Sequence, residues 1–221
     1  MPAFPLRALP CIATALLASA CAMTPMTADP GSDAPERTSP ARRDIELPAS
    51  YDEALGRWRT PLDINDWIGA RFEYDLDRAM RLSESQRETG PRVRIPEPRA
   101  FFDQPVGVCV DLARFAVETL RATSPGSRAA YLMIEFDPAV IAGNTLRRHW
   151  VAQYEVGGRF HFFADSKRPG HLAGPYDTVQ AFIEDYSRYR GRRIVSYRTL
   201  DSYERQLKKS APKATRSERS G

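Results

Sequence analysis

Residues 107–122 read GVCVDLARFAVETLRA, and this stretch decides the fold class that we expect for the chain. After Cys109 the apolar side chains recur at helical spacing until Pro125 ends the pattern: Leu112, Phe115, Ala116 and Leu120. A cysteine that begins a helix lies at the positive end of the helix macrodipole, which stabilises a thiolate. The sequence therefore predicts a helix that begins at Cys109 and carries a thiol suited to nucleophilic chemistry.

The chain before this helix is expected to be helical over residues 52–59, 63–72 and 75–87. The second of these helices has one apolar face, made of Ile64, Trp67 and Ile68. Four prolines within residues 89–105 exclude a continuous helix, so this stretch is predicted to be an extended loop. Two aromatic residues of the loop, Phe101 and Phe102, either line a cleft or pack beneath the loop.

The chain after the Cys109 helix contains mostly strand-like runs. Strands are expected over residues 129–136, 148–156, 159–164 and 192–197, with one helix over residues 178–189. The fold class that we expect for the chain is α+β. We therefore expect the N-terminal helices and the Cys109 helix to pack on an antiparallel sheet.

The adjacent glycines Gly157 and Gly158 predict a tight hairpin, and its register decides which side chains share a face. In one register the two glycines form a two-residue turn, and His149 lies opposite Ser166. That register mixes polar and apolar side chains on both faces of the hairpin. It is therefore the less favoured of the two alternatives.

In the other register, residues 156–158 form a three-residue loop with the last glycine in the left-handed conformation. One face of the hairpin is then wholly apolar: Trp150, Ala152, Tyr154, Phe160, Phe162 and Ala164. Glu155 meets Arg159 across the ladder, and His149 lies opposite Asp165 with Cβ atoms about 4.5 to 5.5 Å apart. A carboxylate at that distance can orient an imidazole.

A nucleophilic thiol needs an imidazole beside it and a third group that orients the imidazole. The preferred register supplies this pair as His149 and Asp165, whereas it places His161 beside Gln153 as the weaker candidate. The sequence therefore groups Cys109, His149 and Asp165 as a candidate catalytic site.

Three segments of the chain resemble the active-site segments of the bacterial transglutaminase-like superfamily: Gly107-Val108-Cys109-Val110-Asp111-Leu112-Ala113, His149-Trp150-Val151 and Asp165. Their order matches, and the likeness covers residues 61–169. The resemblance implies a papain-like fold and acyl transfer at peptide or amide bonds, with hydrolysis favoured over crosslinking. Some members of the superfamily have lost catalysis, so a non-catalytic binding module that retains the fold is the alternative.

The same resemblance gives each site residue a role. Cys109 would be the nucleophile, His149 the general base and then the acid, and Asp165 the group that fixes the imidazole. Gln104 is a candidate donor to the oxyanion, although a glutamine in a proline-rich loop is also expected to be merely solvated. Asp111, two residues into the helix, is expected to compensate the helix dipole.

The N-terminus resembles a bacterial lipoprotein signal. Residues 1–20 hold one positive charge, Arg7, before an apolar run, and the segment from Leu17 to Cys21 resembles a lipobox. We expect export and acylation of Cys21, which anchors the chain to a membrane. In a Gram-negative host Ala22 points to the outer membrane, facing the periplasm. An ordinary cleaved signal, with no role for Cys21, is the alternative.

The remaining boundaries follow from composition. Residues 21–43 are expected to be a lipidated, flexible linker, residues 44–205 the transglutaminase-like domain, and residues 206–221 a disordered basic tail. In the binding-module alternative, Lys167, Arg168 and this tail contact an anionic partner.

Composition also bears on partners. The net charge of +4 comes from bases interleaved with acids, which argues against nucleic acid as a partner. No compact ligand spacing indicates a metal, and no cofactor is expected. The expected partner is a peptide or protein amide in the cell envelope.

Overall fold

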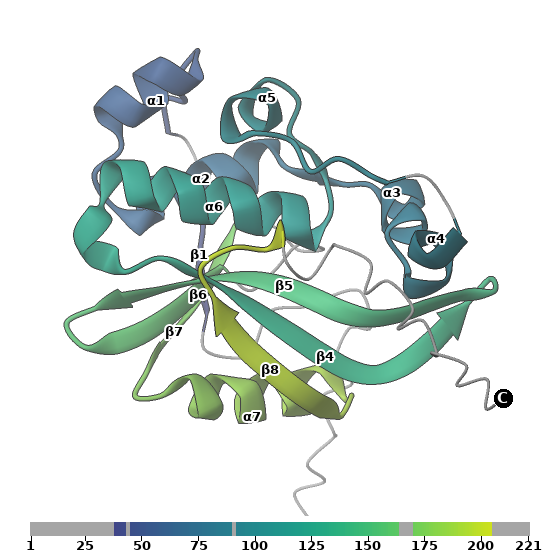
Figure 1. Ribbon diagram of the computed structural model, residues 1–221. Helices are drawn as coiled ribbons and strands as arrows, with labels where there is room; N and C mark the ends of the chain where they lie inside the picture. The colour runs from purple at the N-terminus through teal and green to yellow at the C-terminus, as the bar shows by residue number, and fades with distance from the viewer. Residues whose placement is uncertain (1–37, 43–44, 90–91, 164–169, 205–221) are drawn as a thin grey trace, which may run out of the picture.

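The computed structural model describes residues 38–42, 45–89, 92–163 and 170–204 (Figure 1). The predicted signal sequence with Cys21, the segment with Asp165, Lys167 and Arg168, and the basic tail lie outside the described residues. No helix in the described ranges is long and apolar enough to cross a membrane.

Seven α-helices and a short 3₁₀ turn are found in the described ranges. The α-helices are α1 (Tyr51–Arg57), α2 (Pro61–Arg71), α3 (Leu76–Arg81), α4 (Glu84–Thr89), α5 (Pro98–Asp103), α6 (Cys109–Thr123) and α7 (Val179–Arg190), and the 3₁₀ turn is Pro125–Ser127. The prediction of a helix beginning at Cys109 is confirmed.

The described strands form one large sheet and one small one. The strands are β1 (Thr38–Pro40), β2 (Glu73–Tyr74), β3 (Val106–Gly107), β4 (Ala130–Ile141), β5 (Asn144–Val156), β6 (Arg159–Phe163), β7 (His171–Tyr176) and β8 (Ile194–Leu200). Six of them make an antiparallel sheet in the order β1-β7-β6-β5-β4-β8, and β2 pairs with β3 in parallel. The α+β class with an antiparallel sheet is therefore confirmed.

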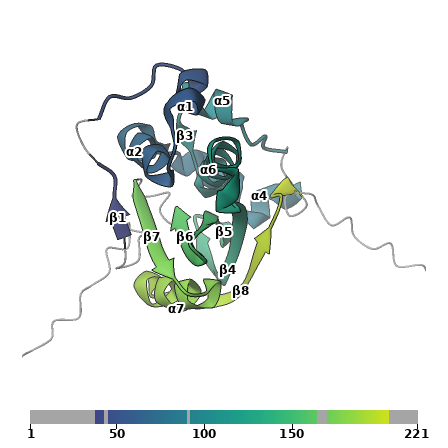
Figure 2. The same cartoon turned by 90° about the vertical axis from the view of Figure 1, so that its left-hand side faces the viewer.

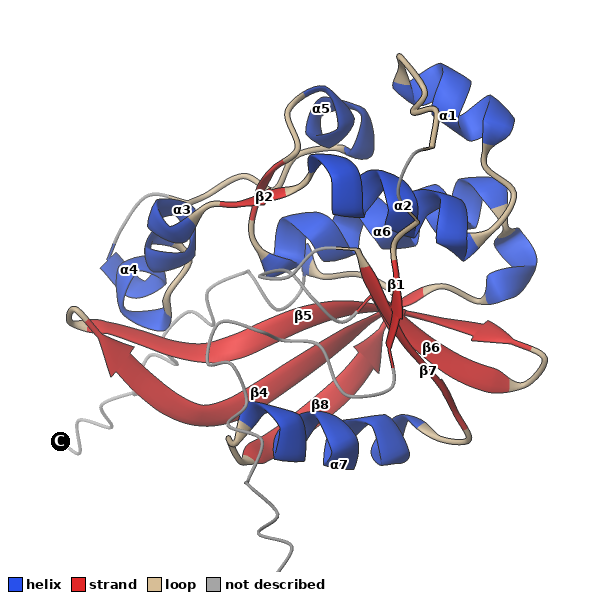
Figure 3. Ribbon diagram, turned by 180° about the vertical axis from the view of Figure 1, so that it is seen from behind, coloured by secondary structure: helices blue, strands red, loops and turns tan. Residues whose placement is uncertain are grey.

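Helices cover both faces of the large sheet. Figure 2 shows α1, α2, α5 and α6 on one face and α7 on the other. The helices α3 and α4 lie beside the far end of the β4–β5 hairpin (Figures 1 and 3). The sheet is thus the middle layer of the molecule, and its two faces border separate apolar cores.

The core on the α6 face is built from stacked aromatic rings. Trp67 of α2 lies with its ring centroid 4.7 Å from that of Phe102 and 4.8 Å from that of Phe115. Phe101 is also fully buried, with a centroid 5.2 Å from that of Phe115. Of the two alternatives for the loop aromatics, packing beneath the loop is therefore the one found.

Two helix predictions need correction. The expected helix over residues 75–87 is broken into α3 and α4, because Asp75 caps the first and the Ser83 hydroxyl accepts from the backbone N–H of Gln86 in the second. The loop over residues 89–105 contains α5, which begins at Pro98. A proline is compatible with the first turn of a helix, so it excludes only continuation through that point.

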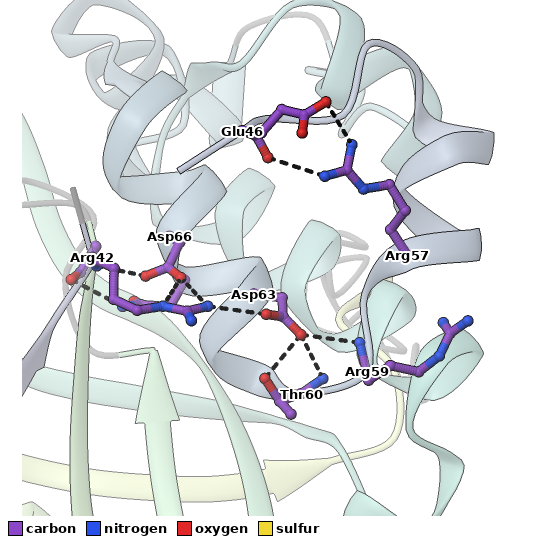
Figure 4. Close-up of polar contacts among 9 residues, drawn as sticks. Arg42, Glu46, Arg57, Arg59, Thr60, Asp63 and Asp66 are labelled. Carbon is purple, nitrogen blue, oxygen red and sulfur yellow. Dashed lines mark hydrogen bonds and ion pairs between the residues drawn. The ribbon is translucent and has the colours of Figure 1, made fainter. Parts of the chain in front are cut away.

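The linker prediction also changes, because the ordered fold begins before residue 44. β1 pairs with β7, a strand that the sequence did not indicate. Figure 4 shows how the following residue, Arg42, is held: its backbone N–H and Nε each lie 2.6 Å from the buried carboxylate of Asp66, and its Nη2 is 3.1 Å from Asp63. At least residues 38–42 therefore belong to the domain.

The preferred hairpin register is wrong. β5 and β6 pair as Val156 with Arg159 and Tyr154 with His161, so the two-residue Gly157-Gly158 turn is the one that forms. Both glycines have positive φ, 58° and 75°, as such a turn requires.

The reason is that both faces of this hairpin are covered. Trp150 and Tyr154 face the α6 core, while Val151 and Phe162 face the α7 core, so no face had to be polar. The predicted pairing of Glu155 with Arg159 is replaced by two other ion pairs. Glu155 meets Arg128, and Arg159 meets Asp177 at 2.9 Å.

Candidate functional site: a cavity at Cys109

Cys109 is placed where α6 meets β5. The β2–β3 pairing brings the chain to this point, and the backbone N–H of Asp75 donates to the carbonyl of Gly107. β6 ends at Phe163, opposite Ala152, so the part of β5 before Ala152 has no strand on that edge among the described residues. The Cys109 thiol lies against this edge, beside the backbone N–H of Trp150.

A buried ion pair fixes the start of α6. Asp111 is fully buried and binds Arg78 of α3 twice, with Nε to Oδ2 at 2.6 Å and Nη2 to Oδ1 at 2.7 Å. The same carboxylate accepts from the backbone N–H of Val108 at 2.9 Å. Asp111 was expected only to compensate the helix dipole. Its partner Arg78 carried no signal in the sequence, because it lies 33 positions away on another helix.

The environment of the thiol favours its neutral form. Burial raises the pKa of Cys109 to about 11, although the backbone N–H of Trp150 acts in the opposite direction. The Asp111 carboxylate raises this pKa further, while the N–H groups at the start of α6 lower it. Cys109 is partly exposed as a residue, but desolvation is still the largest influence on its thiol. The helix macrodipole is therefore outweighed.

His149 does not face Cys109. It pairs with Ile134 on β4, and its side chain lies in the α7 core, where Nε2 is 3.0 Å from the hydroxyl of Tyr186. The next residue, Trp150, faces the α6 core with Cys109 packed against it. The two predicted catalytic residues thus lie on opposite faces of the sheet, because successive strand residues point to opposite sides.

Two other candidate site residues, His161 and Gln104, also lie away from the Cys109 thiol. His161 shares the α6 face but lies opposite Tyr154, four residues along β5 from Trp150, which is about 13 Å at strand spacing. Its ring stacks on that of Tyr154 at 5.1 Å, and burial lowers its pKa. Gln104 is an exposed C-cap of α5 and does not line the cavity at Cys109.

A cavity of about 80 Å³ opens beside the thiol, and we call it the thiol cavity. Residues from α3, α4, the start of α6 and β5 line it: Tyr74, Ala79, Leu82, Ser83, Glu84, Arg87, Val108, Cys109, Val110, Thr145, Leu146, Arg147, Arg148 and Trp150. The sequence analysis did not single out the three arginines of this lining, Arg87, Arg147 and Arg148, although the last two stand directly before His149.

The thiol cavity combines an apolar wall, cationic side chains and a neutral thiol. Burial also raises the pKa of Tyr74, so this phenol stays protonated at neutral pH. No group of three His, Cys, Asp or Glu residues that could hold a metal occurs in the described ranges. The arrangement suits the binding of a small molecule more than proton transfer to and from a thiol.

The chain matches no model of a known protein family, and a search of the curated proteins finds no match.

Proposed function

We propose that the chain is a binding module that takes a small ligand in the thiol cavity and does not perform acyl transfer there. The observation that carries this proposal is the placement of Cys109 and His149 on opposite faces of the sheet. Nucleophilic catalysis by a thiol requires a base within hydrogen-bonding reach. Without such a base, the thiol contributes a polarisable surface and a weak donor to the cavity wall.

The finer fold is part of the proposal. A helix that begins with Cys109 and packs against an antiparallel sheet supports a transglutaminase-like domain. The absence of an imidazole at the thiol, among the described residues, favours the non-catalytic members of that superfamily as the comparison. Cys109 is then a residue of the cavity wall and not a nucleophile.

The experiment that tests this proposal is the pH dependence of iodoacetamide alkylation in the full chain. The reaction is followed by mass spectrometry on the peptide that contains Cys109, so that Cys11 and Cys21 do not contribute. We expect the rate to rise about tenfold per pH unit from pH 7 to pH 10, because only the thiolate reacts. His149→Ala should leave this profile unchanged.

The catalytic alternative predicts the opposite result. A thiolate paired with an imidazole would give a rate plateau near neutral pH, and His149→Ala would shift that plateau upwards. Rapid acylation of Cys109 by an activated ester, lost in His149→Ala, would likewise overturn the binding proposal and leave a cysteine-dependent amide hydrolase in its place.

We also propose, from the N-terminal sequence alone, that the chain is exported and anchored through lipid on Cys21. Cys21→Ser should release it into the soluble envelope fraction and remove the lipid mass from its N-terminus. Unchanged fractionation with no lipid mass in the wild type would contradict the anchor. This outcome is independent of what the thiol cavity binds.

A further inference from the structure

Two large apolar side chains are exposed next to each other at the end of the β4–β5 hairpin. Val140 is 71% exposed and Ile141 is 52% exposed. In the described ranges they are the only exposed large apolar residues that are adjacent in the chain. Figures 1 and 3 show this hairpin reaching past α4 at one end of the sheet. Single exposed apolar residues are ordinary, but a projecting apolar group of residues indicates contact with an apolar partner.

The turn of the hairpin is apolar as well. Ile141 pairs with Asn144, so Ala142 and Gly143 form a two-residue turn, with φ of 47° and 75°. The first position of such a turn favours Asn, Asp or Gly, because an alanine is strained at positive φ. The sequence nevertheless has alanine there, and residues 138–146 contain no charged side chain. We call residues 140–143 the hairpin tip.

The hairpin tip is braced by α4. The side-chain oxygen of Asn144 accepts a hydrogen bond from the Ser83 hydroxyl at 3.2 Å and another from Nε2 of Gln86 at 3.1 Å. A tip that is already ordered loses little conformational entropy when it binds. Because α4 lies against Asn144, only the hairpin tip itself projects, and it can enter a partner only to a shallow depth.

The hairpin at the other end of β5 differs in its charges. Its turn, Gly157-Gly158, follows Val156, which is 54% exposed. Charged residues flank this turn, because Glu155 precedes Val156 and Arg159 follows the glycines. The two hairpins therefore expose valines to a similar extent, but only the β4–β5 hairpin ends in an uncharged apolar surface.

We propose that the hairpin tip inserts Val140 and Ile141 into the surface of the lipid bilayer to which Cys21 anchors the chain. This inference is independent of the thiol cavity and rests on the proposed anchor. The chain from Cys21 to Thr38 is 17 residues long. A chain of that length spans at most about 60 Å, whereas a domain of this size is about 40 Å across. The anchor therefore lets any side of the domain face the membrane.

A bilayer surface suits the hairpin tip because shallow insertion brings no charge into the apolar layer. The nearest charged residues along the hairpin, Asp137 and Arg147, lie at least three residues behind the Ile141–Asn144 pair. That separation is about 10 Å at strand spacing, and interfacial segments enter the bilayer by about 5 to 10 Å. Two apolar side chains bind weakly alone, but an anchor that holds them at the surface raises their effective concentration.

The test places a tryptophan at each of the two hairpins. Val140→Trp and Val156→Trp are made in the full chain and added to vesicles of phosphatidylcholine with brominated acyl chains. Bromine quenches a tryptophan that enters the apolar layer, whereas the three native tryptophans are buried in the protein. We expect quenching about threefold stronger for Val140→Trp than for Val156→Trp. Equal quenching, or none at position 140 at any lipid concentration, would overturn the inference.

A second substitution tests whether the added tryptophan inserts by itself. Ile141→Asp in the Val140→Trp chain places a carboxylate in the hairpin tip, where exposure keeps the fold intact, and should reduce quenching to the level of Val156→Trp. Val195→Asp is the matched control, because Val195 is 42% exposed on β8, away from this hairpin. Undiminished quenching after Ile141→Asp would show that the introduced ring alone enters the bilayer, and would contradict the inference.

The outcomes separate the hairpin tip from the other proposals. If mass spectrometry finds lipid on Cys21 and position 140 is not quenched, only the insertion of the tip is wrong. If no lipid is found and position 140 is quenched at high lipid concentration, the anchor is wrong and the tip still binds bilayers. The alkylation profile of Cys109, which tests the thiol cavity, is independent of both results.

Discussion

The two faces of the sheet bury their polar groups in different ways. On the α6 face, the carboxylate of Asp111 is fully buried and neutralised by Arg78. On the α7 face, the imidazole of His149 meets the phenol of Tyr186, and their rings stack at 5.8 Å. The first arrangement relies on opposite charges and the second on a hydrogen bond between groups that can both be neutral. We expect the α6 face to respond more strongly to the loss of one partner.

The largest effect is expected for Asp111→Ala. This change leaves Arg78 charged, poorly solvated and without its bidentate partner, and it removes the acceptor for the Val108 N–H. Breaking a buried pair from one side costs about 3 to 5 kcal/mol of unfolding free energy. Urea denaturation should detect this loss of unfolding free energy. Asp52→Ala is the control, because Asp52 forms an ion pair with Arg99 on the surface. If Asp111→Ala lost no more unfolding free energy than Asp52→Ala, the ion pair of Asp111 with Arg78 would have to be solvated.

A smaller effect is expected on the other face for Tyr186→Phe. The phenylalanine keeps the ring stacking but removes the hydroxyl that meets Nε2 of His149 and, at 3.4 Å, Nη1 of Arg190. Leaving a buried polar atom without that partner costs about 1 to 3 kcal/mol. Tyr197→Phe is the matched control, since its hydroxyl bonds to Gln180 at the surface. Equal losses in the two variants would contradict the contrast between the faces.

The register that assigns side chains to these faces is tested at Gly157. In the two-residue turn this glycine has φ of 58°, and no atom lies within 4 Å of a Cβ added there. Gly157→Val should therefore cost about 1 to 2 kcal/mol through the backbone alone, whereas Gly157→Asn should cost much less. In a three-residue loop only Gly158 would need the left-handed conformation, and Gly157→Val would be tolerated. Thermal unfolding of the two variants distinguishes these registers.

The smallest effect is the pH dependence of the unfolding free energy that arises from the Cys109 thiol. The unfolded thiol titrates near 8.5 to 9, and the folded thiol has a pKa of about 11, so between pH 9 and 10 only the unfolded chain loses this proton. Stability should therefore fall as pH rises through that window, by at most about 1 kcal/mol. The fall should be shallower in Cys109→Ala. Above pH 10 the tyrosines, whose pKa values burial also raises, add their own contribution. If the unfolding free energies of wild type and Cys109→Ala fell equally with pH, a buried neutral thiol would be contradicted.

The elements that could be predicted from the sequence are those whose periodicity is unambiguous. The helix from Cys109 has one apolar pattern and a proline two residues beyond its end, and it was found as expected. β1 and β7 were missed because they are short and contain Pro40 and Pro175, which obscure a strand pattern. The antiparallel sheet was expected, but its edge strand β1 was assigned to the linker.

The candidate site was harder to predict than the fold, because it depended on which face of β5 is covered by α6. That face carries Trp150, so the side chain of His149, one residue earlier, lies on the other face. The register of the β5–β6 hairpin decided only which β6 side chains share a face with those of β5, because a shift of one residue moves the shifted strand's side chains to the other face. The register was chosen on the assumption that one face of the hairpin is apolar and the other polar. This assumption fails here, since an apolar core borders each face of the sheet. Cys109 lines a cavity and His149 lies in the α7 core, so the predicted pairing between these two residues is not found.

The buried contact of Asp111 with Arg78 also restricts how this sequence can change in evolution. A Cβ at position 107 would lie 2.7 Å from the Asp111 carboxylate, so a side chain there would compete for space with Asp111. The same carboxylate binds Arg78, so positions 78, 107 and 111 are coupled. A substitution at position 78 or 111 alone leaves a charge stranded, whereas joint replacement by apolar residues is tolerated in such pairs. In related sequences, positions 78 and 111 should therefore vary together, and a residue larger than glycine at 107 should appear only where 111 has become small.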